Sequence, residues 1–129
     1  MLRAGSIACL LAMLAACATE VQRTPSAAPV IAAGANSRVI RLGSDVLVNL
    51  HTGYTRTLKR DARWVSVGTI AQGEVFKPEG QVLTVEGAHV HEAYIVVSDG
   101  KLTGFYLPVE NAFVPLVPQK ALPISHQGS

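Results

Sequence analysis

The chain of 129 residues contains only two cysteines, Cys9 and Cys17, and both lie in its first 17 residues. Residues 18–129 therefore have no cysteine for a disulfide, a thiol nucleophile or a cysteine metal site. Aromatic residues are also scarce, at 5% of the chain. We expect the folded part to be stabilised by packing alone, with Val as the dominant apolar residue.

Signatures of catalysis are missing as well. No Gly-x-Ser-x-Gly elbow occurs, so neither Ser66 nor Ser98 has the surroundings of a hydrolase nucleophile. The glycines are scattered at turns and form no phosphate-binding loop. Catalysis needs several convergent polar groups, and the sequence offers few. We therefore expect no enzyme activity and no cofactor.

The one long apolar run is too short to cross a membrane. Residues 6–16 are uncharged and prone to form a helix, and they follow a single positive charge at Arg3. A spanning helix needs about 20 apolar residues, but polar sequence with Pro25 follows almost at once. This pattern predicts a cleaved signal peptide over residues 1–16.

The end of this run, Leu14-Ala15-Ala16-Cys17, resembles the lipobox of bacterial lipoproteins. The resemblance covers residues 1–17 only, and we recognise no family for the rest of the chain. It implies that Cys17 receives a diacylglyceryl group and becomes the acylated first residue after cleavage. Ala18 stands where the family's inner-membrane retention signal usually has Asp, which implies an outer-membrane protein facing the periplasm. An ordinary secretory signal that happens to contain Cys17 is the alternative.

The composition after Cys17 divides the chain into three further parts. Residues 17–37 are rich in Ala, Pro, Ser, Thr and Gly and have no sustained apolar period, which predicts a flexible linker. Residues 38–117 carry the apolar runs of one small domain. Residues 118–129 contain Pro123 and end in polar residues, which predicts a flexible tail.

Short apolar runs separated by turn residues predict an all-β fold. Runs such as 46–50, 64–70 and 81–86 are rich in β-branched residues and end at Gly or Pro. Such spacing is typical of a small antiparallel sandwich or barrel of about six to eight short strands. Residues 54–63 fit an extended segment with a charged turn at 59–61. A small α+β fold with a helix over residues 55–63 is the alternative.

The strongest local signal is a hairpin centred on Asp99-Gly100. Its strands are 91–97 and 102–107. This alignment pairs Val97 with Leu102, Ile95 with Gly104, and Tyr94 with Phe105. A glycine beside a branched residue predicts a bulge or a close backbone contact at Gly104.

Charges are distributed unevenly along the chain. Residues 38–63 contain six basic and two acidic side chains, whereas residues 64–129 contain three basic and six acidic ones. The two halves are therefore expected to attract each other. A second interpretation is a basic patch, containing Arg56, Arg60 and Arg63, that meets lipid head groups or an acidic partner. No nucleic acid is expected, because Thr and Leu rather than aromatic residues separate the bases.

His89 and His91 are the only candidate metal ligands with suitable spacing. Alternate residues of a strand share a face, so two imidazoles there would share one cation, with Glu86 or Glu92 adding an oxygen. A catalytic zinc needs a third protein ligand. The other histidines lie in a predicted turn and a predicted tail, so we expect structural roles for the pair and no metal site.

Tyr94 and Tyr106, with Phe105 beside them, are candidates for a recognition surface next to Pro108. Exposed aromatic residues at a sheet edge bind extended peptides by strand addition. The competing interpretation is that these side chains pack in the core or on a sheet face.

Together these features predict an outer-membrane-anchored lipoprotein with a small β binding domain. Its expected role is as an accessory or structural component of an envelope assembly, such as a secretion or conjugation apparatus. The expected partners are the membrane, through the lipid on Cys17, and a protein of the envelope; no small-molecule substrate is identified. A metal-dependent periplasmic enzyme using His89 and His91 and a passive structural spacer are the alternatives.

Overall fold

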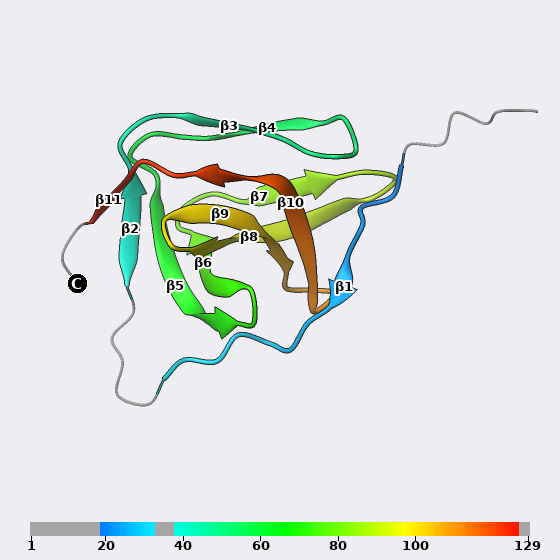
Figure 1. Ribbon diagram of the computed structural model, residues 1–129, viewed down its shortest axis with the longest axis horizontal. Coiled ribbons are helices and arrows are strands. Elements are labelled where there is room, and N and C mark those ends of the chain that lie inside the picture. The colour runs from blue at the N-terminus through cyan, green and yellow to red at the C-terminus, as the bar shows by residue number, and fades with distance from the viewer. Residues whose placement is uncertain (1–18, 33–37, 127–129) are drawn as a thin grey trace, which may run out of the picture.

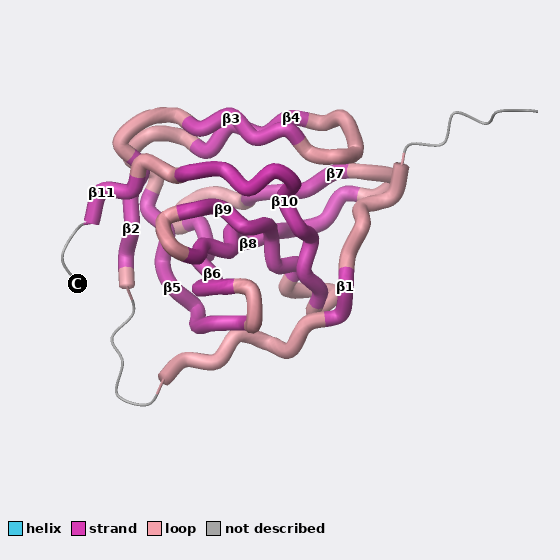
Figure 2. The backbone as a smooth tube through the Cα atoms, viewed as in Figure 1, coloured by secondary structure: helices cyan, strands magenta, loops and turns pink. Residues whose placement is uncertain are grey.

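The computed structural model describes residues 19–32 and 38–126, and every regular element within them is a β-strand (Figures 1 and 2). The strands are β1 (Thr24–Pro25), β2 (Val39–Leu42), β3 (Val46–Asn49), β4 (Thr55–Leu58), β5 (Arg63–Ile70), β6 (Gly73–Pro78), β7 (Leu83–Glu86), β8 (Val90–Ser98), β9 (Lys101–Leu107), β10 (Ala112–Ala121) and β11 (Ile124–His126). The predicted all-β fold is confirmed. The described part of the chain contains no helix able to span a membrane.

Nine strands form one antiparallel sheet in the order β1-β10-β9-β8-β6-β5-β2-β11, with β7 added along the first half of β8. The hairpin β3–β4 forms a separate sheet that lies along β7 and β10 (Figure 1). The described residues contain eleven strands, more than the expected six to eight, and two of them, β1 and β11, come from segments predicted to be flexible.

The main core lies between the curved sheet and the β3–β4 hairpin. Trp64, Phe76 and Phe105 are its largest fully buried side chains. The hairpin contributes every second residue of β3, because alternate side chains of a strand face opposite sides. Val46 and Val48 are buried, whereas Leu47 is 51% exposed.

A smaller apolar cluster occupies the other face of the sheet. It is formed by Val75, Val96, Tyr106 and Phe113. Neighbouring residues on the same strands, such as Ile95 and Phe105, belong to the main core. The central strands are therefore buried on both faces, which explains their near-continuous apolar sequence.

Residues 54–63 adopt the extended conformation that the sequence favoured. Thr55–Leu58 form β4, and Arg60 and Asp61 form the turn that follows it. Asp61 has φ = 64°, a left-handed conformation that Asp tolerates better than most residues. The alternative helix over residues 55–63 is absent from the structure.

The β8–β9 hairpin turns at Asp99 and Gly100, as predicted. Their φ values of 51° and 72° are those of a tight two-residue turn. Val97 pairs with Leu102, but Ile95 pairs with Phe105 and not with Gly104. The shift follows from the bulge predicted near Gly104, which leaves Thr103 without a partner on β8 and moves each later pair by one residue.

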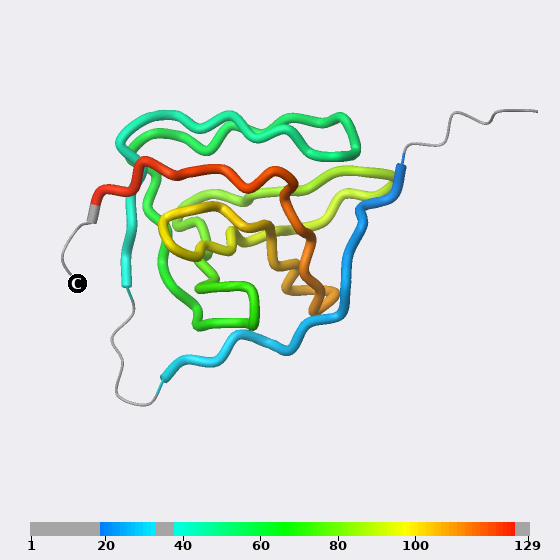
Figure 3. The backbone as a smooth tube through the Cα atoms, in the orientation of Figure 1, coloured from blue at the N-terminus to red at the C-terminus, as the bar shows by residue number. Residues whose placement is uncertain are grey.

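Residues 19–32, which we call the strap, differ from the predicted flexible linker. β1 pairs with β10, Val30 pairs with Thr69 at the end of β5, and Val21 is 3% exposed in the main core. Figure 3 shows the strap running along the sheet from β7 to β5. Backbone hydrogen bonds attach the strap to the sheet, and amino-acid composition alone cannot predict such bonds. Residues 33–37 of the predicted linker lie outside the described residues.

Glycines on the domain make room for the strap. A Cβ at Gly68 would come within 2.8 Å of the backbone of Val30, and one at Gly87 would come within 2.6 Å of the carbonyl oxygen of Thr19. The strap therefore contacts the domain at both of its ends. Only glycine permits so close a backbone approach.

The predicted tail also belongs to the domain. β10 continues to Ala121, and β11 pairs with β2 through His126 and Ile40. Leu122 is 8% exposed between them. Edge pairing requires backbone groups rather than an apolar sequence, so the polar composition of this segment did not reveal it. Residues 127–129 of the predicted tail lie outside the described part.

The contact at Gly104 allows a test of the fold. A Cβ at Gly104 would overlap the carbonyl oxygen of Val114 and the ring of Phe113. We expect Gly104→Ala to lower the free energy of unfolding by roughly 1–3 kcal/mol through overpacking. The control is Gly43→Ala, whose added methyl would lie 3.5 Å from the nearest atom, Pro123 O. Equal denaturant midpoints for the two variants would contradict the packing described here.

Candidate functional site

Ion pairs join the basic first half of the domain to its acidic second half. Arg38 contacts Glu74, Arg56 contacts Glu86, and Arg63 lies 3.1 Å from Glu79. The predicted attraction between the halves is thus confirmed. Arg56 also donates to Thr84 O at 3.0 Å, so it attaches β4 to β7.

The residues predicted to form a partner surface do not form one surface. Tyr106 is 2% exposed, and its hydroxyl donates to Asn111 Oδ1. Burial raises the pKa of Tyr106. Tyr94 packs against its ring, with the centroids 6.3 Å apart. Tyr94 and Tyr106 therefore pack on a sheet face and do not form an exposed recognition surface.

The three predicted arginines are also divided. Arg56 is occupied by its contacts with β7. Arg60 and Arg63 remain on the surface, with side chains 69% and 44% exposed, and each lies near an acidic partner, Asp61 or Glu79. Neutralised in this way, they do not make a strongly basic patch.

The most concentrated group of ionisable side chains contains Glu20, His89, His91 and Glu110, which we call the His–Glu cluster. Glu20 Oε2 lies 2.7 Å from His89 Nδ1, and Glu20 Oε1 lies 3.3 Å from His91 Nε2. On its other side, His91 Nδ1 lies 3.0 Å from Glu110 Oε1. The cluster joins the strap, the start of β8 and the β9–β10 turn. The sequence predicted the histidine pair, but not the two carboxylates.

Geometry explains why this cluster differs from a metal site. His89 Nδ1 and His91 Nε2 both point to one carboxylate, that of Glu20, rather than to a position that a shared cation would occupy. Glu86 is engaged by Arg56, and Glu92 alternates with His91 onto the other face of β8. Within residues 19–32 and 38–126, no group of three potential ligands is arranged to hold a metal.

The cluster instead provides charge-assisted hydrogen bonds. A carboxylate only accepts, and a neutral imidazole has one N–H, so His91 donates to both glutamates only when doubly protonated. Glu20 accepts hydrogen bonds from the His89 side chain and from the backbone N–H of Val21, and these bonds lower the pKa of Glu20 to about 2. The same carboxylate therefore bonds the strap backbone, His91 of β8 and His89 in the turn before it.

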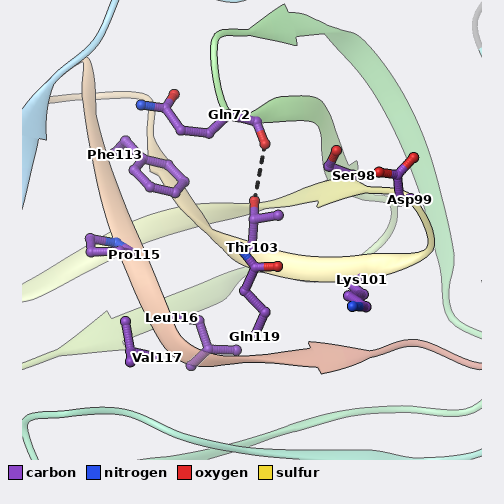
Figure 4. A pocket seen from close by; sticks show the side chains of 10 residues that line it. All are labelled: Gln72, Ser98, Asp99, Lys101, Thr103, Phe113, Pro115, Leu116, Val117 and Gln119. Atoms are coloured by element: carbon purple, nitrogen blue, oxygen red, sulfur yellow. Dashed lines mark hydrogen bonds between the residues drawn. The ribbon is translucent and has the colours of Figure 1, made fainter.

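A second candidate site surrounds a bulge in β10. Between Pro115 and Lys120 the pairing of β10 with β9 is interrupted, so that residues 116–119 face Thr103 alone; we call them the β10 bulge. On one side of it is a groove of about 570 Å³ lined by both polar and apolar side chains, with Thr103 at its centre and Asp99 and Lys101 near the hairpin turn (Figure 4). On the other side is a groove of about 390 Å³ between β10 and β3.

The second groove is bordered by an unpaired strand edge. Leu50 N donates to Tyr54 O at 2.8 Å, and this register places the hydrogen-bonded pairs of the hairpin at Val46 and Val48. Leu47 and Asn49 consequently direct their N–H and C=O groups away from β4. Lys120 Nζ donates to Leu47 O at 2.6 Å, and no other strand of the described residues pairs with this edge.

On the β4 side of the hairpin, its side chains bond the outward edge of β7. Arg56 Nε bonds Thr84 O at 3.0 Å, and Thr52 Oγ1 bonds Glu86 O at 2.5 Å, so two outward carbonyls of β7 are satisfied from the hairpin. The edge of β3, by contrast, borders the groove of about 390 Å³. Chemically it offers main-chain donors and acceptors to an extended peptide.

The sequence contained no direct signal for the β3 edge or for Glu20. The alternation in β3 predicts which residues are buried, but an edge strand is defined by which strands lie beside it. Comparisons of the chain with protein-family models, with curated proteins and with solved structures find no match.

The low pKa of Glu20 predicts how the strap responds to pH. Because the folded-state pKa, about 2, lies below the ordinary 4.5, the ionised carboxylate stabilises the docked strap above pH 4.5. This contribution is lost as the pH falls from 4.5 towards 2. We expect Glu20→Gln to speed hydrogen exchange of the strap amides at pH 7, and the difference from wild type to shrink over that window.

The matched control is Glu92→Gln, which removes a carboxylate on the other face of β8. Glu92 makes no ion pair or side-chain hydrogen bond with any described residue. Its substitution should leave strap exchange unchanged. Mass spectrometry of peptides containing β1 measures both variants, and equal exchange in Glu20→Gln and wild type at pH 7 would refute the role of Glu20.

Proposed function

We propose that the protein is a bacterial outer-membrane-anchored lipoprotein whose β domain binds an extended segment of a protein in an envelope assembly. The proposed assembly is a secretion or conjugation apparatus or one of a similar kind. The anchor rests on the resemblance of residues 14–17 to a lipobox. The binding function rests on one observation, the unpaired edge of β3 beside the groove at the β10 bulge.

The groove supports this mode of binding in two ways. Leu47 and Asn49 direct N–H and C=O groups outward at alternate positions, which is the spacing that strand addition uses. An added strand would replace Lys120 Nζ at Leu47 O. Facing them, Val117 is 83% exposed and provides an apolar contact. Pro115 and Pro118 lack N–H groups, so β10 is the poorer template and the partner would pair with β3.

The two alternatives have less support. A metal-dependent enzyme would use His89 and His91, but both imidazoles are engaged by Glu20. A passive spacer needs no open strand edge, whereas native proteins usually cover or charge such edges. Binding is therefore the function that the geometry favours.

Lipid attachment at Cys17 is tested by metabolic labelling with radioactive palmitate. We expect label in the wild type and none in Cys17→Ser, because Cys17 is the predicted acceptor. The Cys17→Ser protein should also be absent from the outer-membrane fraction. Cys9→Ser is the control, since Cys9 lies within the predicted signal peptide, and it should be labelled and fractionated like the wild type.

Partner binding is tested by photo-crosslinking in native envelopes. A crosslinking amino acid at Asn49 or at Val117 should yield one discrete product of higher mass, because both sites border the groove between β3 and β10. The control site is Val82, which is 70% exposed and lies away from that groove, beside β4. A passive spacer would show no product at Asn49 or Val117.

A further inference from the structure

Two turns of the domain meet at the beginning of the strap. The β3–β4 turn, residues 50–54, contacts it through His51 Nε2, which accepts from Gln22 N at 3.0 Å. The β7–β8 turn, residues 87–89, contacts it through Gly87 and His89. Thr52 Oγ1 also bonds Glu86 O, so the two turns are joined directly. They lie at the same end of the molecule (Figure 1).

This end of the domain, which we call the strap end, has an amphipathic surface. Tyr54 is 45% exposed and Val90 is 67% exposed, and the His89 side chain is 75% exposed. Residues 50–54 and 87–90 contain no Asp or Glu. Glu20 and Glu86, which lie beside these turns, are engaged by histidines and by Arg56. Glu92, two residues along β8 from Val90, is the nearby carboxylate without such a partner among the described residues. The two turns themselves therefore carry no negative charge that would oppose contact with a negatively charged surface.

Covalent geometry limits how far the lipid attachment site can be from this surface. Thr19 O lies beside Gly87, and only Ala18 separates Thr19 from Cys17. Consecutive Cα atoms are about 3.8 Å apart, so the Cα of Cys17 lies within about 8 Å of that of Thr19. A docked strap thus brings any lipid on Cys17 to the strap end, in contrast to the longer reach of a flexible linker.

We propose that the strap end is a membrane-contacting surface that rests on the phospholipid bilayer, with Tyr54 and Val90 at the interface. This inference rests on the proposed lipidation of Cys17. Tyrosine is favoured at membrane interfaces because its ring is apolar and its hydroxyl meets water. The lipid and the two turns then give the domain one orientation, with the strap as a rigid connection.

The orientation is tested with single cysteines carrying an environment-sensitive NBD fluorophore. The lipidated protein has no other free thiol, since Cys17 is modified and Cys9 is removed. Tyr54→Cys and Val90→Cys place the probe at the strap end. Val117→Cys is the matched control, because Val117 is exposed but lies at the β10 bulge. Each labelled protein is reconstituted into vesicles of phosphatidylethanolamine and phosphatidylglycerol.

The expected result is co-sedimentation with vesicles, a blue-shifted emission at positions 54 and 90, and a water-like emission at 117. Co-sedimentation with water-like emission at 54 and 90 overturns the membrane surface but leaves the lipid anchor intact. A blue shift there only in native envelopes assigns the strap end to a protein and also overturns the inference. Failure to co-sediment refutes the lipid anchor itself, and with it the membrane-contacting surface.

Discussion

A carboxylate held between two imidazole rings determines how the N-terminal segment meets the domain. Glu20 contacts His89 and His91 and also accepts from the backbone at Val21. Charge-assisted hydrogen bonds are about twice as strong as neutral ones. Because Val21 is buried in the core immediately beside them, polar and apolar contacts act at the same point of the strap.

The docked strap constrains how the proposed lipid anchor would be placed relative to the domain. A flexible linker would leave the domain free to rotate, so no face would be preferred towards the membrane. With the strap along the sheet, Thr19 lies beside Gly87, at the end of the domain that carries Tyr54 and Val90. The edge of β3 lies along β10 (Figure 1), and residues of these two strands line the groove between them.

Local patterns predicted much of the fold. The Asp99-Gly100 turn, the Gly104 bulge and the extended chain before the charged turn at residues 59–61 each depend on neighbouring residues alone. The strap and the last strands were missed, because their compositions are those of flexible segments and their order comes from distant partners. Gly68 and Gly87 are the sequence features most directly related to the docked strap, because each allows a close backbone approach. A glycine does not reveal, however, which segment approaches it.

The candidate sites divide in the same way. The sequence alone determined the lipobox resemblance, the all-β class and the proximity of His89 to His91, because each depends on residues close together in the chain. Tertiary structure decided that Glu20 occupies the position between the histidines, that Tyr106 is buried and that β3 keeps an open edge. The reason is physical: hydrogen-bond partners and burial depend on which segments meet in space, and residues 69 to 73 apart in the chain meet here.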